Sequence, residues 1–301
     1  MTAGVLAVDK PVGPTSHDVV GVVRRSLGIR QVGHFGTLDP FASGLLVLGV
    51  GPATRLAPFC VGHSKTYRAT VRLGERSDTD DSEGAIVPVA VPVAPCRAAV
   101  ESACAAWVGS VRQVPPAYSA KHVDGRRAYA LARAGETVTL EAVAVRIDSI
   151  EVERYQWPDL DIVVRCGPGT YVRGLARDLG EELGTGAHCA ALRRLASGPF
   201  RVEDALAWRD LSDPATARAA VMPSWRAVAE LPAAIVDAEG QRAFAQGRET
   251  RVPLGGAVSA DWVRVHGPRG FLGMGQVGDG EEGALRLHPR RVLFPDGEDS
   301  G

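Results

Sequence analysis

The chain opens with hydrophobic positions that change from one periodicity to another. Val5–Val8 is a short apolar run that is stopped by prolines, which predicts a buried strand. Residues 15–18, Thr-Ser-His-Asp, have the pattern of a helix capping box, and apolar residues recur at helical spacing through Val19–Leu27. We therefore expect a strand, a turn and an amphipathic helix at the start of the chain.

Strand and helix patterns are interleaved along the rest of the first 230 residues. Alternating or continuous apolar positions predict strands at Leu45–Val50, Lys65–Gly74, Val138–Val152, Leu160–Cys166 and Leu192–Phe200, and helical spacing predicts Cys96–Trp107 and Tyr171–Leu183. No βαβ regularity and no phosphate-binding glycine motif accompany them. The pattern favours an α+β fold with a mixed sheet.

Two segments between these elements are expected to be loops. Gly33–Gly44 is rich in turn residues, and Arg76–Gly84 carries Asp78, Asp80, Asp81 and Glu83. The acidic run lacks the spacing of a calcium-binding loop. It is therefore predicted to be a solvated acidic loop.

The pattern changes near Met222–Pro232, where prolines bracket a short segment and dense Gly and Val follow. This predicts three parts: a main domain over residues 1–230, a small β-rich module over 231–295, and an acidic, disordered tail over 296–301. The module is expected to be a small β-barrel.

Composition changes this picture only in detail. The chain has 301 residues, 34 basic against 35 acidic, and 45% hydrophobic residues, which describes a packed protein with no overall basic character. The five cysteines show no metal-binding spacing, and the N-terminus has neither a signal peptide nor a membrane span. A cytoplasmic protein with reduced thiols, no bound metal and no membrane is expected.

Three segments carry candidate chemistry. The first is GHFGTLDPFASG, residues 33–44, in which Asp39 precedes a proline and is flanked by apolar Leu38 and Phe41. A carboxylate held stiffly and partly desolvated is suited to act as a nucleophile or base. On local chemistry alone, an ordinary Asp-Pro turn is the simpler interpretation.

The second segment is basic, and the third is a glycine turn that leads into a helix. Lys121, Arg126, Arg127 and Arg133 are opposed locally by Asp124 and interleaved with Tyr118 and Tyr129, which suits either an RNA surface or a solvated helix face. In the third, Gly167-Pro168-Gly169, the following helix presents Tyr171 and Arg173 in its first turn. Such an arginine could reach a carboxylate in another loop, or phosphate or solvent.

Together with the opening DKPVGPTS, residues 9–16, these segments resemble the tRNA pseudouridine synthase B family in order and separation. The resemblance covers roughly residues 4–230 and outweighs the simpler reading of Asp39. It implies that Asp39 is the nucleophile, that Tyr67 stacks on the target base and can take part in proton transfer, and that Arg173 pairs with Asp39.

The resemblance also implies RNA contacts for His34, Lys10 and Tyr171, alongside the basic stretch. One departure concerns this stretch: where the family usually has Ser-Ala-x-Lys, this chain has Lys121 one place earlier and His122 at the usual lysine position. The RNA contact of that lysine is therefore open here.

The implied activity is isomerisation of uridine to pseudouridine at position 55 in the TΨC loop of tRNA. It would proceed by base flipping and a covalent link at ribose C1′ or base C6, without a cofactor. The implied fold is a pseudouridine synthase domain with a mainly antiparallel sheet, followed by a PUA-type RNA-binding module. The implied partner is the T-arm of tRNA, bound by a monomer that uses no guide RNA. Two other possibilities remain: an RNA chaperone without chemistry, and the catalytic subunit of a guide-RNA particle.

Overall fold

The computed structural model describes residues 3–117, 122–123, 126–127, 140–253, 261–278 and 284–297. The first half of the chain contains β1 (Gly4–Lys10), α1 (Ser16–Leu27), β2 (Val32–His34), β3 (Ser43–Val50), η1 (Gly51–Leu56), α2 (Ala57–Val61), β4 (Lys65–Leu73), β5 (Glu75–Ser77), β6 (Ile86–Pro88), α3 (Arg97–Ala106), β7 (Gly109–Gln113), β8 (His122–Val123) and β9 (Arg126–Arg127).

The second half completes the main domain and then forms the C-terminal module. It contains β10 (Val143–Gln156), β11 (Asp159–Cys166), α5 (Val172–Glu182), β12 (Ala187–Ser197), β13 (Phe200–Arg201), η2 (Val202–Asp204), β14 (Leu206–Ala207), η3 (Trp208–Asp210), α6 (Pro214–Ala219), η4 (Ser224–Val228), β15 (Ala233–Ile235), α7 (Ala238–Ala245), β16 (Thr250–Pro253), β17 (Trp262–Gly267), β18 (Gly270–Gly278) and β19 (Ala284–Val292).

The strand and the helix predicted at the start of the chain are confirmed as β1 and α1. Helix α1 begins with a capping box in which the Asp18 amide donates to Thr15 Oγ1 at 3.1 Å and the Thr15 amide donates to Asp18 Oδ2 at 2.9 Å. It ends at Gly28, whose φ of 70° is the left-handed conformation that favours glycine. The segment predicted as a loop over Gly33–Gly44 is shorter than expected, because β2 and β3 take residues from both ends.

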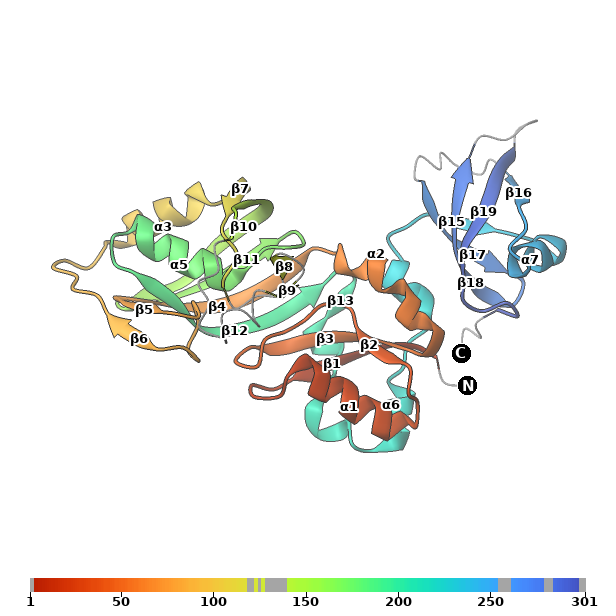
Figure 1. Ribbon diagram of the computed structural model, residues 1–301, viewed down its shortest axis with the longest axis horizontal. Helices are drawn as coiled ribbons and strands as arrows, with labels where there is room; N and C mark the ends of the chain where they lie inside the picture. Colours follow the sequence, from red (N-terminus) through yellow and green to blue (C-terminus); the bar gives the residue numbers. More distant parts are fainter. Residues whose placement is uncertain are drawn as a thin grey trace.

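One long sheet organises the main domain (Figure 1). Its strand order is β14-β1-β3-β12-β4-β11-β10-β7, with β2 added to β3 and β13 added to β12. The β1–β14 and β3–β12 pairs are parallel, and the other pairs of this sheet are antiparallel. The predicted α+β class with a mixed, mainly antiparallel sheet is therefore confirmed.

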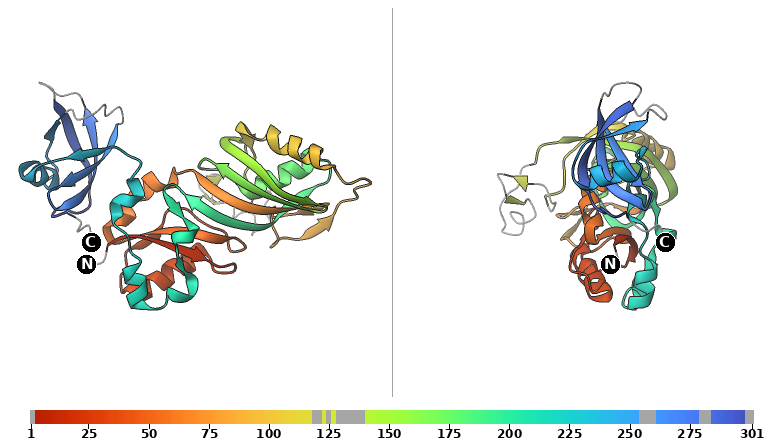
Figure 2. Two further views of the ribbon diagram at one scale, coloured as in Figure 1. Left: turned by 180° about the vertical axis from the view of Figure 1, so that it is seen from behind. Right: turned by 90° about the vertical axis from the view of Figure 1, so that its right-hand side faces the viewer.

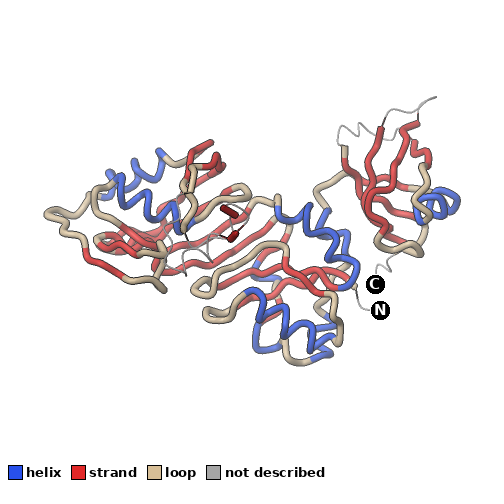
Figure 3. The backbone as a smooth tube through the Cα atoms, viewed as in Figure 1, coloured by secondary structure: helices blue, strands red, loops and turns tan. Residues whose placement is uncertain are grey.

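Helices cover the sheet unevenly, as the tube view shows (Figure 3). Helices α3 and α5 pack against β10, β12 and β4, whereas α1 packs beside β2 and α6 at the other end of the sheet. The main core joins both ends: it includes Val19 and Val23 of α1, Leu46 of β3, Ala69 of β4 and Leu175 of α5. Alternate residues of β4 leave this core, because side chains of a strand point to opposite faces.

The C-terminal module lies at one end of the molecule, visible from both sides (Figures 1 and 2). Its sheet has the order β15-β17-β18-β19-β16, packed over its own core and helix α7. A second cluster joins it to the main domain: the rings of Phe59 and Trp262 meet edge to face at 4.9 Å, and Arg55 Nη1 donates to the Val292 carbonyl at 2.8 Å. Across the described ranges, no helix is long and apolar enough to span a membrane.

Candidate active site

Asp39 lies in the loop of residues 35–42, which joins β2 to β3. The flanking side chains of Leu38 and Phe41 are buried and anchor the loop in the main core. Ser16 Oγ donates to the Leu38 carbonyl and accepts from the Leu38 amide, both at 2.8 Å. Because its neighbours are fixed in this way, the Asp39 carboxylate is presented from a rigid turn while its own side chain remains 37% exposed.

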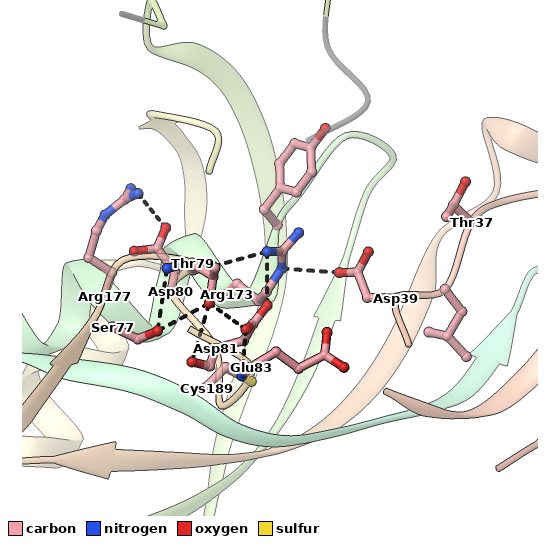
Figure 4. Close-up of polar contacts among 12 residues, drawn as sticks. Thr37, Asp39, Ser77, Thr79, Asp80, Asp81, Glu83, Arg173, Arg177 and Cys189 are labelled. Atoms are coloured by element: carbon pink, nitrogen blue, oxygen red, sulfur yellow. Dashed lines mark hydrogen bonds and ion pairs between the residues drawn. The ribbon is translucent and has the colours of Figure 1, made fainter. Parts of the chain in front are cut away.

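Arg173 meets Asp39 from the first turn of α5 (Figure 4). Its Nε lies 3.0 Å from Asp39 Oδ2, and its Nη1 lies 3.0 Å from Asp81 Oδ2. Nη1 also donates to the Thr79 carbonyl at 3.0 Å. The arginine side chain is only 6% exposed, so a buried guanidinium lies between two carboxylates that come from different loops.

A second arginine of α5 repeats this arrangement one turn further along the helix. Arg177 Nη1 pairs with Asp80 Oδ2 at 2.8 Å, its Nη2 lies 2.8 Å from Asp178 Oδ1, and it also donates to the Val114 carbonyl at 2.8 Å. Asp80 and Asp81 are thus both paired with α5, through Arg177 and Arg173 respectively, and these two ion pairs hold the acidic loop against the helix.

This finding corrects the prediction of a solvated acidic loop at residues 76–84. Asp80 and Asp81 are 9% and 3% exposed, and both are paired with arginines of α5. The prediction failed because a charged loop is exposed to solvent only when no opposite charges pack against it. Here the partners, Arg173 and Arg177, lie more than 90 residues away in the sequence.

Burial and charge together set the ionisation of the carboxylates. Burial raises the pKa of Asp39 above its usual value, and the nearby Asp81 carboxylate adds to this, whereas Arg173 opposes it. Burial likewise raises the pKa of Asp80 to about 6, against the effect of Arg177. A partly desolvated carboxylate kept near an arginine can exist as the anion with only part of its hydration, which is the state that a carboxylate nucleophile requires.

Tyr67 lies on β4, facing the helix-covered side of the sheet. It is 8% exposed, and burial raises the pKa of its hydroxyl, while the positive charge of Arg194 of β12 opposes this rise. Tyr171 precedes α5, and its backbone is held by the amide group of Gln113: the Tyr171 amide donates to Gln113 Oε1 at 2.8 Å, and Gln113 Nε2 donates to the Tyr171 carbonyl at 3.0 Å.

Lys10 of the opening motif lies inside the protein. Lys10 is fully buried, and its Nζ donates to the carbonyls of Pro11, Pro14 and Pro40 at 2.8, 2.9 and 3.4 Å. Burial lowers the pKa of Lys10 to about 8, although Asp39 partly offsets this. Lys10 thus joins the opening loop to the Asp39 loop, and its predicted contact with RNA stays a prediction.

His34 ends β2 beside the Asp39 loop. Burial lowers the pKa of its imidazole, and Arg194 and His17 lower it further, so the ring is neutral near pH 7. Its buried Nδ1 has no hydrogen-bond partner among the residues that the structure describes. The predicted contact of His34 with RNA stays a prediction.

Of the predicted basic stretch, the structure describes only part of the backbone. Arg126 and Arg127 form β9, which pairs with His122 and Val123 of β8 in an antiparallel ladder. Lys121 and Arg133, like the tail residues 298–301, lie outside the described residues.

Sequence reasoning missed three buried polar side chains of this site: Asp81, Arg194 and Gln113. The only sequence signal for Asp81 was the acidic run itself. For Arg194 the signal was its position next to Arg193 in a strand, because successive side chains of β12 point to opposite faces of the sheet. Within the described parts of the chain, no group of three or more His, Cys, Asp or Glu residues is placed to hold a metal ion.

Comparison with known proteins agrees with this geometry. Residues 24–172 match the model of the TruB family pseudouridylate synthase N-terminal domain, and residues 173–229 match that of the tRNA pseudouridylate synthase B C-terminal domain. The tRNA pseudouridine synthase B of Arthrobacter sp. (strain FB24) is 49% identical over 71% of this chain and 72% of its own length. That of Thermobifida fusca (strain YX) is 47% identical over 76% and 80%, respectively.

The fold is also similar to that of a solved structure, a Cbf5-Nop10-Gar1 complex. The TM-score is 0.76 at 24% identity, and the superposition covers 98% of this chain and 86% of the other. The match therefore extends over the C-terminal module as well as the main domain.

Proposed function

The chain belongs to the TruB family of pseudouridylate synthases, and from this premise we propose that Asp39 is the nucleophile with which it modifies position 55 in the TΨC loop of tRNA. The enzyme isomerises uridine to pseudouridine in tRNA. The observation that carries the proposal is the contact of Arg173 Nε with Asp39 Oδ2 at 3.0 Å, which brings together the residues of two distant motifs.

The reaction moves the ribose from N1 to C5 of the same base, so the base must first leave the RNA loop. Flipping costs a few kcal/mol, and the flipped base is read in a pocket by stacking and hydrogen bonds. We infer that Tyr67 supplies the stacking surface and that its hydroxyl can take part in proton transfer.

Asp39 then forms a covalent bond to ribose C1′ or to base C6. If the bond forms at C1′, the N1–C1′ bond breaks, the base rotates, and C5 then attacks C1′ and displaces the Asp39 carboxylate. If it forms at C6, the ribose moves from N1 to C5 within the adduct, and the Asp39–C6 bond then breaks and frees the carboxylate. In both cases the C5 proton is lost and N1 gains one. Arg173 keeps Asp39 ionised and oriented, with Asp81 fixing the other side of the guanidinium.

The rest of the chain would hold the tRNA. We propose a catalytic domain over residues 1–230, a PUA-type RNA-binding domain over 231–295 and an acidic tail over 296–301. The separate core of the C-terminal module supports this division. His34, Lys10, Tyr171, Lys121, Arg126, Arg127 and Arg133 are proposed to contact the T-arm stem-loop or to support such contacts. The enzyme would act in the cytoplasm as a monomer without guide RNA.

The purified chain tests this proposal directly. Unmodified tRNA transcript and a minimal T-arm stem-loop, each carrying uridine tritiated at C5, would be incubated with the protein alone. We expect tritium release from both substrates, mapped to position 55. Release from tRNA that maps to another uridine, or that requires an added guide RNA, would overturn the proposal.

A further inference from the structure

Arg194 of β12 is a buried cation that belongs to none of the sequence motifs. Its side chain lies on the helix-covered side of the sheet and the residue is 2% exposed. The preceding residue, Arg193, points to the opposite side, where it pairs with Asp9 at 2.8 Å and is 38% exposed. A guanidinium that pairs with no carboxylate among the described residues is costly to bury unless its donors are used in other ways.

The donors of Arg194 bind the loop that carries Asp39 and the strand β3 that follows this loop. Nε donates to the Leu45 carbonyl at 2.7 Å, Nη1 to the Thr37 carbonyl at 3.1 Å, and Nη2 to the Gly36 carbonyl at 3.2 Å. These carbonyls precede and follow Asp39 in the chain. Because the guanidinium is planar and rigid, one side chain fixes the start of the loop relative to β3, into which the loop leads.

The same side chain is directed at Tyr67. Arg194 and Tyr67 are directly paired across the β4–β12 ladder, so their side chains share one face. The positive charge of Arg194 opposes the rise in the pKa of the Tyr67 hydroxyl that burial causes.

At Gly44, the backbone of β3 lies very close to the backbone of Arg194. Gly44 has a φ of 100°, and a Cβ there would come within 2.3 Å of the Arg194 carbonyl oxygen. Only glycine permits so close an approach in this conformation. The end of the loop therefore has little freedom to slide along β12.

We propose that Arg194 is a positioning residue that holds the Asp39 loop and the Tyr67 hydroxyl in register, so that both meet the same flipped nucleotide. This inference rests on the proposed roles of Asp39 and Tyr67. It predicts that Arg194 and Tyr67 are energetically coupled. A change at Arg194 should lower the single-turnover rate most when the Tyr67 hydroxyl is present.

The test combines a double-mutant cycle with a matched control. Arg194→Lys, Tyr67→Phe and the double variant are compared with Arg193→Lys, the same change on the opposite face of the same strand. Single-turnover rates at saturating enzyme, the Kd for unmodified tRNA and the melting temperature are measured for each. Arg194→Gln serves as a second variant if the lysine variant does not fold.

We expect Arg194→Lys to lower the single-turnover rate by at least about 30-fold while the Kd for tRNA changes less than about threefold. In the Tyr67→Phe background the same change should cost no more than about sixfold, a coupling of at least about fivefold. Arg193→Lys should leave the rate unchanged. Equal losses in both backgrounds, or a loss that follows only the melting temperature, would overturn the inference.

A spectroscopic readout separates this inference from the proposed function. The protein has five tyrosines, so the ¹⁹F signal of 3-fluorotyrosine at position 67 can be assigned by its loss in Tyr67→Phe. Arg194→Lys should move that signal and Arg193→Lys should not. If Arg194→Lys does not move the signal, the positioning role is refuted, whatever the activity. If Arg194→Lys moves the signal but the wild-type protein makes no pseudouridine, only the proposed function is refuted.

Discussion

The two faces of the catalytic sheet carry ion pairs of nearly equal length and very different surroundings. On the open face, Arg68 of β4 meets Glu153 of β10 at 2.8 Å, and these side chains are 53% and 34% exposed. On the face covered by α5, Arg173 meets Asp81 at 3.0 Å, and these side chains are 6% and 5% exposed. Distance alone therefore does not distinguish the pairs.

The two pairs differ in whether water can solvate one charge when its partner is removed. An exposed pair exchanges one set of good interactions for another, so it contributes between zero and about 1 kcal/mol. A buried pair has lost its water, and removing one partner leaves a charge that nothing else solvates. The buried Arg173–Asp81 pair can therefore hold a fixed positive charge beside Asp39, whereas the exposed pair on the open face contributes little to stability. Five changes sharpen this contrast.

Asp39→Asn should have the largest effect. The amide is almost the same shape but is a poor nucleophile, so pseudouridine formation should fall by at least about 10⁴-fold while the fold and tRNA binding remain. Tritium release and tRNA affinity measure the two quantities. Turnover at a substantial fraction of the wild-type rate would exclude Asp39 as the nucleophile.

Arg173→Lys keeps the buried charge but removes the planar fork. The ammonium of lysine does not reproduce the two fixed directions in which Nε meets Asp39 and Nη1 meets Asp81, so we expect a loss of roughly 10²–10³-fold in the single-turnover rate. The matched control is Arg177→Lys, which changes the neighbouring pair of the same helix without touching Asp39. A near-normal rate for Arg173→Lys would show that the paired geometry is unimportant.

Asp81→Asn should change the pH dependence as well as stability. Asp39 must be ionised to act, and its pKa is raised first by burial and then by Asp81, so activity falls with decreasing pH at a midpoint above that of an ordinary aspartate. Removing the Asp81 charge should move this acid limb to lower pH, lower the maximal rate and destabilise the fold by up to about 3 kcal/mol. Single-turnover rates between pH 4 and 8 test the shift; an unmoved limb would contradict it.

Removing Arg126 and Arg127 together should affect RNA binding rather than chemistry. Each phosphate contact steepens the fall of log affinity with log salt by up to about 0.9 for duplex and about 0.7 for single strands. The double variant should bind tRNA more weakly and flatten that slope by roughly one to two units, with turnover of saturating tRNA much less affected. If the slope is unchanged, the stretch is an ordinary solvated surface.

Arg68→Gln should have the smallest effect. It removes the exposed pair with Glu153 and should change the free energy of unfolding by less than about 1 kcal/mol and leave pseudouridine formation unchanged. Urea denaturation and tritium release check both. A large loss of either would mean that the open face also takes part in catalysis or in the stability of the site.

The sequence by itself determined the elements and the central residues of the site. Prolines, glycines and the capping box located α1, and the alternation of β4 placed Tyr67 on the buried face. The order of four motifs indicated Asp39 and Arg173, and the structure brings them to 3.0 Å. These features depend on local spacing or on residue identity, which the sequence carries directly.

Only the tertiary structure decided which charges lie inside. Asp81 and Asp78 belong to one acidic run, yet Asp81 is buried against α5; Arg193 and Arg194 are adjacent, yet one faces solvent and the other holds the Asp39 loop. The environment of a charge is set by the partners that fold onto it and by the water they exclude. Those partners lie far away in the chain, so no local pattern contains them.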